Sequence, residues 1–441
     1  MDLLTSEIAK ATGGVLSGAD VEVSGATIDS RQAVAGQLFV PVVAARDGHD
    51  FVAAAVAGGA AAYLTSRGPV EGVDASAVEV GDTVEALAAV GRHARTRLPE
   101  RVVGITGSVG KTSVKDLLAV ALAVRWRTSA SVGSFNNELG VPLTLVNAAD
   151  DTEALVVEMG ARGVGHIAQL CTLASPTIGV VTRVAAVHTE TFGTLEEVAA
   201  AKGELVEALP GGGYAILNAG DPYVAAMASR TSAAAVTFGD GGEVRAESAA
   251  LDDELRPSFR LVSPWGSAPV RLEVRGEHMI DNALAAAASA LVCGVPVAGI
   301  AEALGAAALS RWRMDLVRLA SGALVVNDAY NANPTSMAAA LRALERLPAR
   351  RRVAVLGLMA ELGDSSDEEH VAVGRLARDL GVEVIGVAVP AYGGTTVASV
   401  DDVPAALGTL GGGDAVLLKG SRVAGLERLM ELLESPSEPS H

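Results

Sequence analysis

The sequence is poor in aromatic and cysteine residues. Aromatic residues make up only 3% of the 441 residues, so the hydrophobic core must be built mainly from alanine, valine and leucine. The only cysteines, Cys171 and Cys293, are isolated, which gives no disulfide framework and no CxxC metal site. A reducing compartment, the cytoplasm, is therefore the natural expectation.

Basic residues and long apolar runs are also scarce. Acidic residues outnumber basic ones 52 to 34, and the net charge of −18 argues against a nucleic-acid partner. The N-terminus has no apolar stretch of signal-peptide length, and the most hydrophobic stretch, 117–124, is too short to span a bilayer. We expect a soluble monomer that is not inserted in a membrane.

What the sequence does contain predicts a folded chain of about three α/β domains. Apolar residues make up 50% and charged residues 20%, which excludes wholesale disorder. We place the domains at 1–99, 100–310 and 311–441. The first is predicted to be small, with strands at 37–43 and 61–64; a helical face is expected around Leu3, Leu4 and Ile8, and a longer helix at 82–97.

The second and third domains alternate apolar strands with helices, which is typical of parallel sheets covered on both faces. Expected strands are 102–105, 154–157, 178–181 and 215–217 in the central domain, and 324–327, 353–356, 384–389 and 415–418 in a C-terminal domain of Rossmann-like type. An antiparallel excursion is expected at 237–274, followed by a buried alanine-rich helix at 282–292. The tail 435–441 has no core residue.

The strongest motif is a phosphate loop, GITGSVGKT, at 104–112. It follows a strand and opens a helix, so its backbone N–H groups and the helix N-terminus can hold an anion. Lys111 would reach the β/γ phosphates, and Thr112 would ligate magnesium. Ile105 stands where the general pattern has glycine. The alternative is a glycine-rich turn with a solvated lysine, and the motif alone names no reaction.

Glu158 follows the predicted strand 154–157, so it should lie at the carboxyl edge of the sheet beside the phosphate loop. That position favours a magnesium ligand over a solvent-facing charge. His188 also lies past a strand, but a lone histidine carries little weight. Lys202 lies on an expected helix at 195–207 and by itself looks like any surface lysine, because no spacing argument distinguishes it.

Several segments together resemble the Mur ligases. They occur in order between about residues 29 and 422: TGSVGKT at 106–112, GSFNNELGVP at 133–142, VEMG at 157–160, the stretch 188–204, GEH at 276–278 with Asn282, DAYNANP at 328–334, GLMAELG at 357–363 and KGSR at 419–422. The last three resemble the family member that joins D-alanyl-D-alanine to UDP-N-acetylmuramoyl-tripeptide. The DNPR-type segment of the sibling that adds the third residue is not seen.

The resemblance implies an ATP-dependent ligation through an acyl phosphate, giving the UDP-MurNAc-pentapeptide precursor of peptidoglycan. It implies a third domain that closes over the second. ATP-binding positions are then Thr106, Gly107, Ser108, Val109, Gly110, Lys111, Thr112, Ser113, Asn282, Arg313, Asp328, Asn331 and Asn333. Magnesium ligands are Thr112, Glu158, His188 and Lys202, the last as a carbamate, and the catalytic residues are Lys111, His188 and Lys202.

Substrate-binding positions also follow from the resemblance. They are Ser30, Arg31, Asp47, Gly48, His49, Asn136, Asn137, Lys419, Ser421 and Arg422. The chain departs from the family at Ser134, Arg183 and Gly220, and an extra cation at Arg183 could alter nucleotide affinity. Alternatives that stay open are a Mur-type ligase with another amino substrate, a nucleotide-binding regulator and a non-enzymatic scaffold. The sequence leaves open whether the tripeptide ends in diaminopimelate or lysine.

Overall fold

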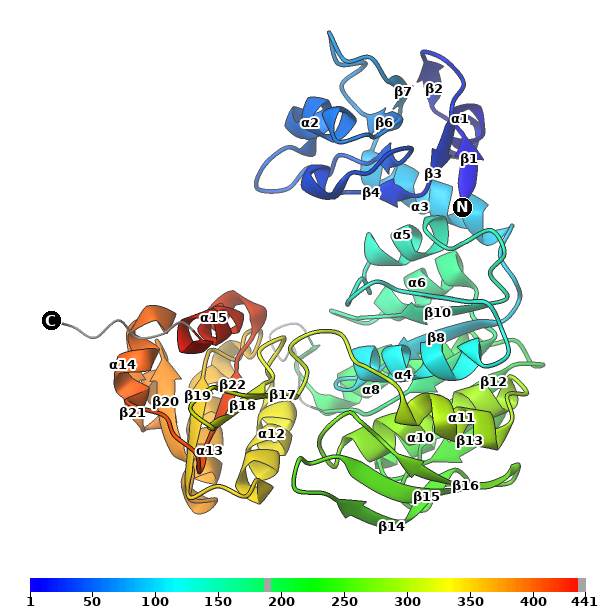
Figure 1. The fold of residues 1–441 in the computed structure, drawn as a ribbon. Helices are drawn as coiled ribbons and strands as arrows, with labels where there is room; N and C mark the ends of the chain where they lie inside the picture. The colour runs from blue at the N-terminus through cyan, green and yellow to red at the C-terminus, as the bar shows by residue number, and fades with distance from the viewer. Residues whose placement is uncertain (186–191, 435–441) are drawn as a thin grey trace, which may run out of the picture.

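The computed structural model describes residues 1–185 and 192–434, and the chain forms a three-domain α/β fold (Figure 1). In the view of Figure 1 the blue N-terminal domain lies above the cyan and green central domain, and the yellow-to-red C-terminal domain lies beside it. No helix of the described ranges has the length and apolar character that a membrane crossing needs.

The central domain is built on a six-stranded sheet of order β13-β12-β11-β8-β10-β9, in which all pairings are parallel. Its elements are β8 (Val102–Thr106), α4 (Lys111–Ala123), β9 (Thr128–Ala130), α5 (Gly140–Val146), β10 (Ala154–Glu158), α6 (His166–Ala174), β11 (Ile178–Val181), α8 (Leu195–Glu207), β12 (Tyr214–Asn218), α9 (Pro222–Ala225), β13 (Ala234–Phe238), α10 (Met279–Val292) and α11 (Val297–Gly305). A three-stranded antiparallel sheet, β14 (Arg245–Leu251), β15 (Pro257–Ser263) and β16 (Gly266–Arg271), is inserted before α10.

Strand periodicity divides the central core into two layers. Successive side chains of a strand point to opposite faces. Leu155 and Val157 therefore pack with α5, α6 and α8, whereas Ala154 and Val156 pack with α4 and α10. Both faces are buried, which explains why the predicted strands read as continuous apolar runs.

The C-terminal domain has a six-stranded sheet of order β17-β18-β22-β19-β20-β21, with only β17 antiparallel. Its elements are β17 (Asp315–Arg318), β18 (Leu324–Asn327), α12 (Pro334–Arg346), β19 (Arg351–Leu356), α13 (Ser366–Asp379), β20 (Glu383–Val387), β21 (Thr395–Val397), α14 (Val403–Leu407), β22 (Asp414–Lys419) and α15 (Leu429–Glu434). Its two apolar layers are separate from those of the central sheet.

The N-terminal domain holds a five-stranded sheet of order β2-β7-β6-β5-β4 and a two-stranded pair, β1 with β3. Its elements are β1 (Asp2–Leu4), α1 (Thr5–Thr12), β2 (Val15–Ser17), β3 (Glu22–Ser24), β4 (Ala26–Thr27), β5 (Leu38–Phe39), α2 (Val52–Ala57), β6 (Ala62–Thr65), β7 (Ser76–Glu79) and α3 (Thr83–Arg95), with the 3-10 turns Ser30–Gln32 and Gly48–Phe51. The predicted helical face at Leu3 and Leu4 is wrong, because both residues pair in β1 with β3 and the helix starts at Thr5.

The N-terminal and central domains share one hydrophobic core, in which Leu87 of α3 belongs to the same cluster as Val141 of α5. The helices α3 and α5 approach closely at Gly91, where an added Cβ would lie 2.9 Å from Pro142. Asn147 bonds the backbone of Ala26 twice, accepting from its N–H and donating to its C=O, each at 2.9 Å. These contacts join the two domains along a broad, largely apolar junction.

Candidate active site

The candidate site lies where the carboxyl ends of β8, β10 and β11 meet. The chain passes from β10 on one side of β8 to β11 on the other, so this is the switch point of the sheet, where open α/β sheets hold ligands. The phosphate loop follows β8, Glu158 ends β10, and Thr182 follows β11.

The phosphate loop is closed tightly around two glycines with positive φ. An added Cβ at Gly107 (φ 147°) would lie 1.9 Å from Thr182 Oγ1, and one at Gly110 (φ 86°) would lie 2.5 Å from Asn282 Oδ1. Gly110 is the N-cap of α4, so the first N–H groups of this helix face the loop. The loop therefore has the backbone shape that an anion-binding cradle requires.

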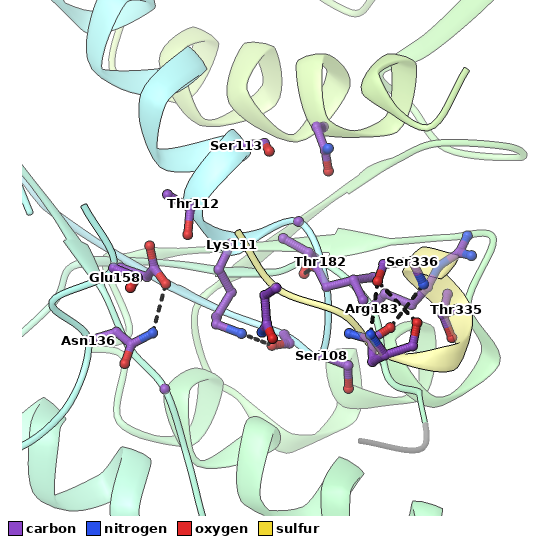
Figure 2. Close-up of a pocket in the computed structure, with 18 of the residues that line it drawn as sticks. Ser108, Lys111, Thr112, Ser113, Asn136, Glu158, Thr182, Arg183, Thr335 and Ser336 are labelled. Atoms are coloured by element: carbon purple, nitrogen blue, oxygen red, sulfur yellow. Dashed lines mark hydrogen bonds between the residues drawn. The ribbon is translucent and has the colours of Figure 1, made fainter. Parts of the chain in front are cut away.

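Lys111 folds back over that loop. Its Nζ donates to the carbonyl of Gly107 at 2.7 Å (Figure 2). Burial lowers the pKa of Lys111, Arg313 lowers it further, and Glu158 opposes this shift. An ammonium bonded to a neutral carbonyl can turn to an anion that enters the cradle.

Glu158 is 1% exposed and lies in the same cavity. Its Oε1 accepts from Asn136 Nδ2 at 2.8 Å (Figure 2), while its Oε2 is buried with no hydrogen-bond partner. Thr112 is also buried and lines the cavity. One unsatisfied carboxylate oxygen near a hydroxyl fits a hard cation, for which oxygen is the preferred ligand atom.

No group of three or more His, Cys, Asp or Glu side chains that could hold a metal occurs within residues 1–185 and 192–434. His188 lies outside the described residues. Among the described residues, Thr112 and Lys202 line the cavity together with Glu158.

Lys202 on α8 is 2% exposed and lines this cavity. Its Nζ lies 5.8 Å from the centre of the Phe192 ring, and no described residue accepts a hydrogen bond from it. Burial and the nearby Lys111 ammonium lower the pKa of Lys202 to about 7. A substantial share of this amine is therefore neutral near pH 7, unlike an exposed lysine with its pKa of about 10.4.

The C-terminal domain supplies the opposite wall. Asp328 follows β18 and Lys419 ends β22, the strand next to it. Lys419 Nζ bonds Asp328 Oδ2 at 2.5 Å and the carbonyl of Asn331 at 3.0 Å, and Asp328 Oδ1 accepts from the N–H of Met314 at 3.2 Å. Asp328, Asn331 and Lys419 are thus joined in one part-buried network.

Arg313 lies in the segment between the central and C-terminal domains, with its guanidinium carbon 4.2 Å from the centre of the Tyr330 ring. Its Nε is buried without a hydrogen-bond partner. Tyr330 in turn bonds Ser134 of the central domain through its hydroxyl. The departure at Ser134 therefore falls on a contact between the two walls.

Together the walls enclose a cavity of about 670 Å³ between the central and C-terminal domains. Figure 2 shows Thr335 and Ser336 at the start of α12 and the phosphate loop around this space. The predicted residues that line it are Gly107, Ser108, Val109, Gly110, Lys111, Thr112, Ser113, Asn136, Asn137, Glu158, Lys202, Asn282, Arg313, Asp328, Asn331, Asn333 and Lys419.

Some predicted residues have side chains engaged in local structure. Asn333 caps α12 by accepting from Ser336 N at 2.9 Å, and Asn137 accepts from Gly140 N at 3.0 Å. Ser421 accepts from Ala360 N at 2.9 Å, and Arg422 lies over the Trp312 ring, 4.2 Å from its centre. Thr106, Ser421 and Arg422 do not line the cavity.

The predicted residues of the N-terminal domain, Ser30, Arg31, Asp47, Gly48 and His49, do not line it either. His49 is 6% exposed, and both ring nitrogens are used: Nδ1 lies 2.6 Å from Asp47 Oδ1, and Nε2 accepts from Ser66 N. Arg31 pairs with Asp29 at 2.8 Å and has 86% of its side chain exposed. His49 thus braces a loop, while Arg31 is open to a ligand.

Other lining residues carried no sequence signal of their own. Arg162, His166 and Gln169, at or near the start of α6, line the cavity, and their spacing matches no motif. Arg183 lines it as well, 3.7 Å from Asp281, whose pKa burial raises. The extra cation noted in the sequence therefore stands beside a carboxylate, next to Asn282.

Comparison with known families gives two matches. The Mur ligase middle domain matches residues 105–290, and the Mur ligase glutamate ligase domain matches residues 312–422.

The chain is also similar to proteins over its whole length. A protein of Mycobacterium tuberculosis named UDP-N-acetylmuramoyl-tripeptide--D-alanyl-D-alanine ligase is 40% identical, over 98% of each chain, and one of the same name from Escherichia coli is 36% identical, over 97% of this chain and 98% of its own. The crystal structure of MurF from Acinetobacter baumannii superposes with a TM-score of 0.87 at 30% identity, covering 98% of this chain and 99% of that one. The MurF ligase of Thermotoga maritima, solved in complex with ADP, has a TM-score of 0.80 at 27% identity, covering 93% and 97%.

Proposed function

The chain belongs to the Mur ligase family, and we infer that it joins D-alanyl-D-alanine to UDP-N-acetylmuramoyl-tripeptide with ATP. The products are the UDP-MurNAc-pentapeptide used to build peptidoglycan, ADP and phosphate. One observation carries this assignment in the structure. The phosphate loop and the DAYNANP and KGSR segments, which are far apart in sequence, flank a single cavity, and Lys111, Asn331 and Lys419 all line it.

A carboxylate does not react with an amine at neutral pH, so the tripeptide carboxylate is first phosphorylated. Its oxygen attacks the γ-phosphorus, the bond to ADP breaks, and an acyl phosphate forms. The amine of D-alanyl-D-alanine then attacks the acyl carbon, loses a proton, and displaces phosphate. Such phosphoryl transfer depends mainly on positioning and on charge neutralisation.

We propose that Lys111 neutralises charge on the β/γ phosphates, supported by its place over the cradle and by its hydrogen bond to the neutral carbonyl of Gly107. Thr112 and Glu158 would hold magnesium, and the buried, unpartnered Oε2 of Glu158 supports this role. Magnesium, when bound, would neutralise phosphate charge during transfer. Asn282, beside Gly110, would face the base of the nucleotide.

On the opposite wall, Arg313 would contact phosphate, because its Nε is buried with no hydrogen-bond partner among the described residues. Asp328 would bind the ribose; its Oδ2 already bonds Lys419, which holds the carboxylate in place. Closure of the C-terminal domain would bring these groups onto the nucleotide and exclude water from the acyl phosphate.

Lys202 would carry a carbamate. Its amine nitrogen would attack the carbon of CO2 and lose a proton, which leaves an anionic carbamate able to orient a hard cation. The buried position and the lowered pKa of Lys202 support this modification, because only the neutral amine can attack. His188 would complete the ligand set by resemblance alone.

We assign the UDP-sugar portion of the substrate to residues 1–99, ATP to residues 100–310 and the final ligation wall to residues 311–441. The exposed guanidinium of Arg31 supports contact with the UDP diphosphate. We also propose that the chain acts as a monomer, since both cavity walls come from one chain. The free cysteines Cys171 and Cys293 support a cytoplasmic location.

The deciding experiment incubates the protein with ATP, magnesium, UDP-MurNAc-tripeptide and D-alanyl-D-alanine, and detects the pentapeptide by mass. ADP and phosphate should appear only when both substrates are present, and parallel reactions with diaminopimelate- and lysine-containing tripeptides identify the third residue. Addition of a single amino acid to UDP-MurNAc-dipeptide, with no use of D-alanyl-D-alanine, would reassign the chain to the sibling enzyme. Nucleotide binding with no product would favour a regulator.

A further inference from the structure

A buried ion pair on the phosphate-loop helix has no part in the reaction as described above. Lys115 and Asp116 of α4 have side chains only 4% and 13% exposed, and Lys115 Nζ lies 2.7 Å from Asp116 Oδ1. The pair lies one helical turn beyond Lys111 and Thr112. Neither residue lines the cavity.

The second oxygen of Asp116 holds the segment that leads to the C-terminal domain. Asp116 Oδ2 accepts from both the N–H and the hydroxyl of Ser310, each at 2.8 Å. Ser310 lies between α11 and β17, in the linker formed by residues 306–314. Hydrogen bonds to an ionised carboxylate are shorter and stronger than those between neutral groups.

The same pair reaches toward the candidate magnesium ligand. Lys115 Nζ donates to the carbonyl of Ser131 at 2.8 Å, and Ser131 Oγ accepts from the N–H of Glu158 at 3.1 Å. A continuous set of polar contacts therefore runs from the strand end that carries Glu158, through α4, to the start of the linker.

Beyond Ser310 the linker adopts an unusual backbone conformation. Trp312 and Met314 have φ values of 62° and 56°, in a region that costs energy for residues with a side chain. The N–H of Trp312 is held by Asp315 Oδ2 at 2.6 Å, and that of Met314 by Asp328 Oδ1 at 3.2 Å. Arg313, between them, is thereby placed in the cavity.

We propose that Asp116 is a positioning residue for the ligation. By holding Ser310 it fixes the point at which the linker leaves the central domain, and hence where Arg313 and Asp328 meet the phosphate loop. This role rests on the proposed function, because it concerns the alignment of two walls in one reaction. Displacement of a reacting group by about 1 Å can cost on the order of a hundredfold in rate.

The test compares two double variants, Lys115→Met with Asp116→Asn and Lys115→Met with Asp116→Leu. Both remove the buried charges, and asparagine and leucine have similar size, but only asparagine offers Ser310 an acceptor oxygen. The asparagine variant should retain kcat within about threefold of wild type, whereas the leucine variant should lose about tenfold or more. Melting temperatures of the two should agree within a few degrees.

Domain alignment is measured separately by fluorescence energy transfer. The natural cysteines are buried, so dyes can be attached at exposed positions introduced by Ala228→Cys in the central domain and Thr396→Cys in the C-terminal domain. With ATP and magnesium, the wild type and the asparagine variant should each give one narrow distribution of energy-transfer efficiency. The leucine variant should give a broader distribution. Equal kcat and equal distributions in the two double variants would overturn the proposal.

A smaller substitution keeps the test valid if the double variants do not fold. Ser310→Ala removes only the hydroxyl bond to Asp116 and should lower kcat several-fold, whereas Ser229→Ala, at an exposed serine of the central domain, should not. Identical kcat in these two serine variants also contradicts the proposal. If the wild type forms no pentapeptide, the proposed function fails, yet the energy-transfer comparison still decides whether Asp116 holds the linker.

Discussion

The junctions on either side of the central domain are held by different forces. At the N-terminal junction, Leu87 and Val141 belong to one continuous hydrophobic core, and Asn147 bonds the Ala26 backbone twice. At the C-terminal junction the apolar clusters are separate, apart from Leu255, which packs with the C-terminal core. Polar contacts also cross this junction, including Ser134 with Tyr330 and Arg346 with Glu277.

The two kinds of junction allow different motions. An apolar core shared by two domains moves as one body, whereas a polar contact surface lets domains move relative to each other. The cavity proposed to hold ATP and the two substrates lies at the second junction. Changes at the cavity should therefore alter activity without altering stability, and changes at the N-terminal junction should do the reverse.

The largest effect is expected for Lys111→Ala. This change removes the ammonium that neutralises phosphate charge, so kcat should fall about a thousandfold. The melting temperature should stay within a few degrees, because the hydrogen bond from Lys111 Nζ to the carbonyl of Gly107 lies within the loop itself. ADP release and thermal unfolding are the measurements, with Lys10→Ala at an exposed lysine of α1 as the control. Near-normal turnover in a folded Lys111 variant would contradict the phosphate-loop assignment.

Lys202→Ala should cost about a hundredfold in activity, an effect typical of disturbed metal ligation. The small side chain leaves room for acetate or formate, which should restore part of the activity. Lys202→Met fills that room without an amine and should not be rescued. Full activity of Lys202→Ala, or an unmodified ammonium in an active, metal-loaded crystal, would remove the carbamate from the mechanism.

The same carbamate predicts a pH dependence. With a pKa of about 7, Lys202 is mostly protonated at pH 6 and mostly neutral at pH 8. Because only the neutral amine takes up CO2, wild-type activity should rise across this range and should fall when bicarbonate is removed. The acetate-rescued Lys202→Ala enzyme lacks this amine, so a rise of the same size in that variant would count against the carbamate.

Leu87→Ala tests the shared core directly. Removal of a fully buried leucine leaves a cavity and should cost about 2–5 kcal/mol. Calorimetry should show a lower melting temperature for the joined N-terminal and central domains. The melting temperature of the C-terminal domain should not change. Leu341→Ala, in the separate C-terminal core, should give the opposite pattern. A Leu87 variant that shifts only a small N-terminal transition would show that the first junction is not a single cooperative unit.

The smallest effect compares single polar contacts at the two junctions. Asn147→Ala leaves the part-buried N–H and C=O of Ala26 unpaired and should cost about 1–3 kcal/mol. Arg346→Ala breaks a 2.9 Å ion pair whose side chains are 46% and 66% exposed, and such pairs are worth about 0–1 kcal/mol. Urea unfolding measures both, and equal costs would remove the contrast between the junctions.

Features set by local sequence could be predicted. The helix Leu195–Glu207 has the predicted bounds, since a capping box between Thr194 and Glu197 fixes its start. The strand Leu324–Asn327 is also found at its predicted bounds, because its apolar run is buried on both faces. The phosphate loop could also be predicted, because the glycines and the lysine that shape it lie within a few residues of one another.

Features set by distant partners could not be predicted. Leu3 and Leu4 form a strand only because Glu22 and Val23 pair with them. The burial of Lys202, which lowers its pKa, depends on the packing of α8 against the central sheet. The role of Asp116 requires the contact with Ser310, 194 positions along the chain.

The close approach of α3 to α5 at Gly91 restricts which domains of this chain could be exchanged for those of a related protein. Any side chain there would meet Pro142, so a donor N-terminal domain could be grafted on only together with a matching α5. The C-terminal domain carries its own core and could be exchanged for another by altering a short hinge and a few polar contacts. Under the domain roles proposed above, the domain assigned to the incoming amine is therefore free to diversify, while the domain assigned to the nucleotide sugar must change together with the central domain.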